Sequence, residues 1–136
     1  MIGIVIVTHG ELAATLAKTV ELVIGEQESL EPVCLNAFEG LEDLKAKVDG
    51  AIKSAGKNSD GRVLVFTDMF GGSTTNVSLQ FLSEKVEILA GVNLPMLLEA
   101  LLLRNGIESS HALAKDVSEK AKKSIIPLSE MHKPWL

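Results

Sequence analysis

The sequence predicts an α/β fold with a doubly wound, mainly parallel sheet of four strands and a short C-terminal edge strand. The 136-residue chain opens on an unbroken apolar run at residues 2–7, and 46% of all residues are hydrophobic. Such runs are typical of parallel strands that are buried on both faces. Short apolar runs then alternate with amphipathic helical patterns, which implies right-handed crossovers. A chain of this length forms one domain, expected to span residues 1–136.

The elements can be placed in order along the chain. After the first strand, large apolar residues at helical spacing predict a helix over Glu11–Ile24 that stops at Gly25: Leu12, Leu16, Val20 and Val23. The further expected elements are a strand at 31–37, a helix at 41–55, a strand at 62–67, a helix at about 74–83, a strand at 86–90, a helix from 94 to about 104, a helix capped by Ser109 or Ser110, and a strand at 124–128. Pro127 restricts this last strand to an edge.

Charge and cysteine content exclude several classes of protein. The net charge of -5 comes without a basic stripe, so neither nucleic acid nor an anionic membrane surface is expected as a partner. The lone Cys34 can form no internal disulfide and is expected to be a small buried hydrophobe in a reducing compartment. Without a leader or a membrane-spanning run, we expect the protein to be cytoplasmic.

No metal or other cofactor is expected. His111 lies at a helix start and His132 in the polar tail, so both are expected to be solvated, and no ligand spacing joins either to Cys34 or to a carboxylate. The sequence contains no GxxxxGK[ST], GxGxxG or GxSxG motif. Nucleotide hydrolysis, dinucleotide binding and α/β-hydrolase chemistry therefore have no support.

Polar residues follow three of the predicted strands and should meet at one edge of the sheet. His9 ends the first strand, Asp68 follows the third, and Asn93 follows the fourth. In open α/β sheets, ligands bind at this carboxyl edge. A carboxylate that accepts a hydrogen bond from Nδ1–H fixes the histidine tautomer and leaves Nε2 free to attack. We therefore predict His9 as a nucleophile, oriented by Asp68, with Thr8, Gly10 and Asn93 in supporting positions.

A glycine-containing loop after Asp68 can hold an anion. Gly71 and Gly72 allow main-chain N–H groups to approach a phosphate, with the hydroxyls of Ser73 and Thr75 beside them. A lone strand-end histidine or a Gly-Gly-Ser turn is often structural, but their combination at neighbouring strand ends is more specific. The lack of nearby Arg and Lys favours a phosphoryl group that is passed on easily.

Taken together, the motifs resemble the IIA component of the mannose family of the bacterial phosphoenolpyruvate:sugar phosphotransferase system. The resemblance covers nearly the whole chain in the expected order: residues 7–10, Leu16 with 18–19, residues 25–28, Asp68 with 71–73, Asn76, and residues 90–96. It implies a phosphotransferase component with a phosphohistidine intermediate, in which His9 accepts a phosphoryl group from HPr and passes it to a IIB partner. IIB is expected on a separate chain, through which the protein could associate peripherally with a membrane sugar permease.

The resemblance also implies a homodimer in which a C-terminal strand, at about residues 122–130, is exchanged between the subunits. Trp135 then either packs at the dimer interface or extends freely. One residue departs from the family pattern: Thr74 stands where proline is usual. We expect this change to alter loop rigidity modestly without loss of chemistry.

Two alternative functions remain open at this stage. The first is a regulatory module, in which phosphorylation of His9 changes binding to a partner outside transport. The second is the phosphotransfer subunit of a dihydroxyacetone kinase, against which the Gly71-Gly72-Ser73 sequence argues.

Overall fold

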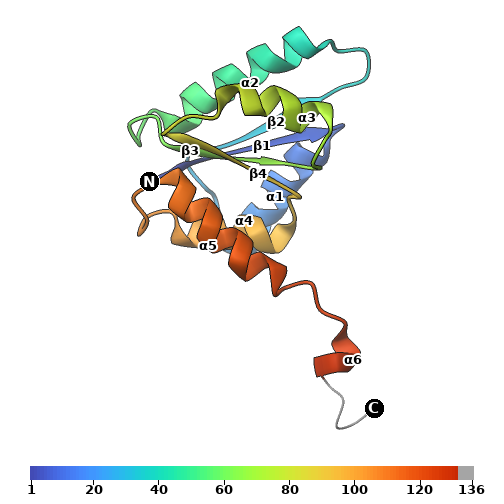
Figure 1. The fold of residues 1–136 in the computed structure, drawn as a ribbon, viewed down its shortest axis with the longest axis vertical. Coiled ribbons are helices and arrows are strands. Elements are labelled where there is room, and N and C mark those ends of the chain that lie inside the picture. Colours follow the sequence, from blue (N-terminus) through green and yellow to red (C-terminus); the bar gives the residue numbers. More distant parts are fainter. Residues whose placement is uncertain (132–136) are drawn as a thin grey trace.

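A computed structural model describes residues 1–131 and contains one four-stranded parallel sheet with the order β2-β1-β3-β4 (Figure 1). The strands are β1 (Gly3–His9), β2 (Leu30–Leu35), β3 (Val63–Thr67) and β4 (Val86–Ala90). The chain begins in the middle of the sheet, moves outward to β2, and then crosses back to β3 on the other side of β1. The strand order therefore reverses between β1 and β3, which is where open α/β sheets bind ligands.

Helices cover both faces of the sheet, as predicted for a doubly wound fold. Their bounds are α1 (Leu12–Ile24), α2 (Leu41–Gly56), α3 (Ser73–Ser78), the 3-10 helix η1 (Leu79–Phe81), α4 (Leu94–Leu103), α5 (Ser110–Lys122) and α6 (Leu128–Met131). Figure 1 shows α2 and α3 on one face and α1, α4 and α5 on the other. Among the described residues, none of these helices is long and apolar enough to cross a membrane.

Side chains alternate along β1 and so supply two apolar cores. Ile4 and Ile6 pack with α1, α4 and α5, whereas Val5 and Val7 pack with α2 and α3. All four side chains are fully buried. This two-sided burial explains the unbroken apolar run in the sequence. As an inner strand, β1 ends within the carboxyl edge of the sheet, between β2 and β3.

The buried face of α1 differs from the predicted one. The structure buries Ala13, Ala17 and Val20, whereas Leu12 and Val23 are exposed. Small residues let the helix approach the sheet closely, and a pattern that counts large apolar residues overlooks alanine. The helix itself was predicted correctly, but its orientation was wrong by about one residue.

The predicted C-terminal edge strand is not formed in this chain. Residues 125–127 have no regular structure, Leu128–Met131 form α6, and the segment extends away from the sheet (Figure 1). A strand needs a neighbour for its main-chain hydrogen bonds, and Pro127 offers no N–H. Instead the Glu130 N–H donates to the Pro127 carbonyl and begins a helical turn. His132 and Trp135 lie outside the described residues.

A buried arginine joins elements at the opposite edge of the sheet. Arg104 follows α4, is 3% exposed, and donates hydrogen bonds to the carbonyls of Ile2, Glu28 and Ser29. It also donates to the side-chain carbonyl of Gln27. These contacts connect the end of α4 to the starts of β1 and β2, so Arg104 stabilises the side of the sheet that lies away from His9.

Candidate active site

The structure brings His9 and Asp68 into direct contact. His9 is the last residue of β1, and Asp68 follows β3, whose Thr67 pairs with Val7. The ring Nδ1 of His9 lies 2.7 Å from Asp68 Oδ2, and the backbone N–H of His9 donates to the same oxygen at 2.9 Å. Both the ring and the main chain of His9 are therefore held by one carboxylate oxygen.

This contact determines which ring nitrogen of His9 is free. An ionised carboxylate accepts hydrogen bonds and donates none, so the hydrogen of the neutral ring lies on Nδ1. Within residues 1–131, Nε2 has no hydrogen-bond partner, and the side chain is 46% exposed. Nε2 therefore carries an accessible lone pair, as a nucleophile requires.

Asp68 is set up to remain ionised. Partial burial raises the pKa of Asp68. Hydrogen bonds from the Thr74 hydroxyl, the His9 backbone N–H and the His9 ring lower the pKa by more than burial raises it, so it lies below its usual value. The Thr74 hydroxyl donates to Oδ1, the oxygen that does not face His9, at 2.6 Å. This contact was missed by the sequence analysis, which expected Thr74 to affect loop rigidity alone. A hydroxyl six positions after Asp68, in the first turn of a helix, was the available signal.

The glycine loop approaches the His9 ring closely. A Cβ atom on Gly72 would lie 3.2 Å from His9 Cε1 and 3.1 Å from Met69 Cγ, and Gly71 has a φ of +85°. Gly72 is also the N-cap of α3 and offers no side chain to cap its first amides. The amides at the start of α3, beginning with that of half-buried Ser73, therefore have no partner within the helix. They are the donors that an anion beside Nε2 could use.

Thr75 does not take part in this cradle. Its side chain is 3% exposed, and its hydroxyl donates to the Met69 carbonyl at 2.6 Å and shares a 2.7 Å hydrogen bond with the Thr67 hydroxyl. The expectation that the Thr75 hydroxyl faces a phosphate is corrected by this inward orientation. Thr75 instead fastens the loop to the end of β3.

The three supporting residues shape the loops around the pair. The Thr8 hydroxyl accepts a hydrogen bond from the Ala13 N–H at 2.7 Å and so fixes the start of α1. Gly10 has a φ of +59°, which glycine adopts without strain and which turns the chain after His9. Asn93 caps α4 by accepting from the Met96 N–H at 3.0 Å. All three hold the scaffold, and none has a hydrogen bond to His9 or Asp68 among the described residues.

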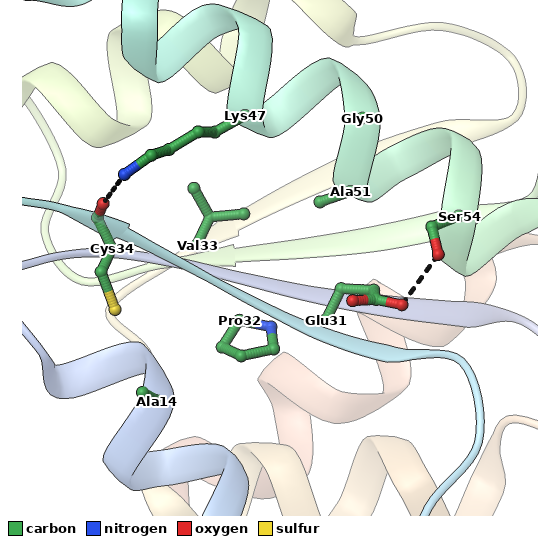
Figure 2. Close-up of a pocket in the computed structure, with 9 residues that line it drawn as sticks. All are labelled: Ala14, Glu31, Pro32, Val33, Cys34, Lys47, Gly50, Ala51 and Ser54. Atoms are coloured by element: carbon green, nitrogen blue, oxygen red, sulfur yellow. Dashed lines mark hydrogen bonds between the residues drawn. The ribbon is translucent and has the colours of Figure 1, made fainter.

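A groove of about 420 Å³ lies apart from the pair, beside the edge strand β2 (Figure 2). Lys47 donates to the Cys34 carbonyl across it, and Ser54 donates to Glu31. Cys34 is half-buried, somewhat more exposed than expected. The groove contains neither His9 nor Asp68, so the candidate chemistry stays at the strand ends.

His111 is not free in solvent, contrary to expectation. Its Nδ1 lies 2.6 Å from Glu87 Oε2, and its Nε2 lies 2.8 Å from the Ser83 carbonyl oxygen. Since both partners are acceptors, the contacts favour the doubly protonated ring, and the pKa of His111 is raised by Glu87 and then by Ser83. This histidine joins the start of α5 to β4. Within residues 1–131, no group of His, Cys, Asp and Glu side chains could hold a metal ion.

The structure is a doubly wound α/β domain that presents an exposed histidine, held by a carboxylate, where the strand order reverses. A model of the family described as "PTS system fructose IIA component" matches residues 3–118. The chain belongs to this mannose-type IIA family, and it is a phosphotransfer component of a sugar phosphotransferase system.

Individual relatives agree with the family. The chain is 33% identical over 124 residues to a fructose-specific EIIA component of Bacillus subtilis, covering 90% of this chain and 80% of that one. It is 38% identical over 106 residues to the mannose-specific EIIAB component of Escherichia coli, covering 76% of this chain but 32% of that longer one. The crystal structure of an EIIA component from Streptococcus agalactiae superposes with a TM-score of 0.81 at 30% identity, covering 96% of this chain and 99% of that one.

Proposed function

We propose that the protein is a phosphoryl carrier, in which His9 Nε2 accepts a phosphoryl group from phospho-HPr and passes it to a IIB partner during sugar uptake and phosphorylation. The contact between His9 Nδ1 and Asp68 carries this proposal, because it leaves Nε2 unprotonated and exposed. In the forward step a bond forms between Nε2 and phosphorus while the bond from phosphorus to HPr breaks. The second step is the same displacement with IIB as the acceptor.

Asp68 and the loop have separate roles in this step. As Nε2 shares its lone pair with phosphorus, the ring gains positive charge, which the adjacent Asp68 carboxylate stabilises. The amides of Gly71 and Ser73, with the Ser73 hydroxyl, contact the phosphoryl oxygens. The Gly72 N–H donates to the Met69 carbonyl, and Gly72 contributes by leaving room beside the His9 ring. No Arg or Lys occurs between Thr67 and Glu84. Contacts from neutral donors release the group more easily than a bidentate arginine would.

We also propose that the protein acts in the cytoplasm as a homodimer and reaches a membrane sugar permease through IIB. The C-terminal segment at 122–130 leaves Ile125 and Leu128 exposed, and β4 is an edge strand. Exchange of this segment onto β4 of a second copy would cover the two exposed side chains and the open edge of β4. Sedimentation should then give a dimer, and a full-length chain that stays monomeric at high micromolar concentration would contradict the exchange.

Phosphorylation in a reconstituted system tests the carrier function. Incubation with phosphoenolpyruvate, enzyme I and HPr should yield one phosphate per chain that is labile in acid and stable in base. The His9→Ala variant should not be labelled. His111→Gln is the matched control, because His111 also pairs with a carboxylate but has no free ring nitrogen, and it should be labelled like the parent. Undiminished labelling of His9→Ala would refute the proposal.

A further inference from the structure

The Asp68 carboxylate is held from two sides. His9 directs two donors at Oδ2, whereas the Thr74 hydroxyl donates to Oδ1 at 2.6 Å. Thr74 is fully buried and is the second residue of α3. Threonine is branched at Cβ, so few side-chain rotamers fit a helix. The observed rotamer points the hydroxyl at Asp68. Asp68 is therefore hydrogen-bonded to α3 through Thr74 as well as to the histidine that it orients.

We propose that Thr74 is a positioning residue for phosphotransfer at His9, acting through Asp68. This inference rests on the proposed function. Rotation of a carboxylate about its terminal bond is soft. With a donor on Oδ1, the carboxylate is fixed with Oδ2 facing the ring, and the ring in turn is fixed with Nε2 facing outward. Thr74 has no hydrogen bond to His9, so its effect on the nucleophile passes through Asp68.

The Thr74 hydroxyl also lowers the pKa of Asp68. Partial burial opposes ionisation of this carboxyl group, whereas the hydrogen bonds from the Thr74 hydroxyl and from His9 favour it and lower the pKa of Asp68 overall. The one titratable group that acts on Asp68 within the described residues is His9. Without the Thr74 hydroxyl, Asp68 should become protonated at a higher pH. A protonated Asp68 carries no negative charge to stabilise the positive ring that forms on transfer, so transfer should slow at a higher pH as the solution is acidified.

The test compares Thr74→Val with Thr74→Ser. Valine keeps the shape of threonine but removes the hydroxyl, whereas serine keeps the hydroxyl. We expect Thr74→Val to slow phosphorylation of His9 by about tenfold, the effect of losing one charge-assisted hydrogen bond. The acid limb of its rate-against-pH curve should move to higher pH, and Thr74→Ser should restore most of both. Ser78→Ala is the matched control, because Ser78 lies in the same helix and is also buried. Its hydroxyl donates to the Thr74 carbonyl and does not contact Asp68.

A second measurement is independent of HPr. Imidazole ¹⁵N chemical shifts report which ring nitrogen carries the hydrogen, and the parent should show the Nδ1–H form of His9. Thr74→Val should show a mixture of the two tautomers, whereas Ser78→Ala should match the parent. Thr74→Ala provides the same comparison should the valine variant not fold.

The outcomes separate this inference from the function on which it rests. A parent protein that is not phosphorylated on His9 would overturn the proposed function. A labelled parent, with Thr74→Val unchanged in rate, acid limb and tautomer, would overturn the role of Thr74 alone. A slower Thr74→Val variant with parental tautomer and pH profile would also overturn it, because the loss would then be structural.

Discussion

Replacing Asp68 by asparagine isolates the charge of the carboxylate from its shape. The asparagine carbonyl oxygen should take the position of Oδ2, because both hydrogen-bond partners there, the N–H and the Nδ1–H of His9, are donors. The amide NH₂ then faces the Thr74 hydroxyl, whose oxygen can accept. The tautomer of His9 and the fold are therefore retained, and the free energy of unfolding should fall by about 1 kcal/mol or less.

The expected loss of rate follows from the missing charge. Two unit charges about 4 Å apart interact by about 1 kcal/mol in water and by about 4 kcal/mol at an effective dielectric constant of about 20. The His9 side chain is 46% exposed, which favours the lower part of this range. A loss of about 1–2 kcal/mol of transition-state stabilisation slows phosphotransfer by about 5- to 30-fold.

Quenched-flow phosphorylation by phospho-HPr measures this rate directly. Glu87→Gln is the matched control, because it removes the carboxylate beside His111 and should leave the rate unchanged. Asp68→Ala should be slower than Asp68→Asn, since it loses orientation as well as charge. Parental rates in Asp68→Asn would remove the carboxylate from the mechanism.

Three further predictions follow from single contacts. Gly72→Ala should slow transfer by about tenfold in the same assay while the circular dichroism spectrum is retained, because the new Cβ crowds the His9 ring; parental rates would show that the loop yields. Arg104→Met should lower the free energy of unfolding in urea by about 2–4 kcal/mol, since it leaves buried carbonyls without donors; an unchanged denaturation midpoint would contradict this. Glu87 and then Ser83 raise the pKa of His111 in the folded protein. The protonated ring therefore stabilises the fold fully at pH values below the pKa of His111 in the unfolded chain, and this stability is lost as the pH rises through the folded-state pKa. Thermal melts should show this loss in the parent and not in His111→Gln, and equal pH dependence would refute it.

The strands and most helices could be predicted because their signals are local. Continuous apolar runs gave β1 and β3, and the cap of α5 at Ser109 follows from its residue type and position. The pairing of His9 with Asp68 was also predictable, since parallel strands bring their carboxyl ends to one edge. No side-chain detail was needed for this step. Topology alone places those two residues together.

The contacts that could not be predicted depend on how loops fold back. The inward turn of Thr75, the bond from Thr74 to Asp68 and the two partners of His111 each join residues whose side-chain directions are set by tertiary packing. The C-terminal strand failed for another reason. Its apolar pattern is a valid strand signal, but a strand forms only beside a partner, and this segment extends away from the sheet and does not pair with the edge strand β4 of its own chain.

The difference between the two described histidines supports the assignment of His9 as the nucleophile. Both rings contact a carboxylate through Nδ1, and both are nearly half exposed. His111 begins a helix that packs against the loop before β4, so the Ser83 carbonyl occupies its second nitrogen. His9 ends β1, and the connections after β1 and β3 leave toward opposite faces of the sheet. Among the described residues, no main-chain carbonyl forms a hydrogen bond with Nε2. The free Nε2 that the proposed reactivity requires therefore depends on the position of β1 in the sheet, and the carboxylate partner alone does not provide it.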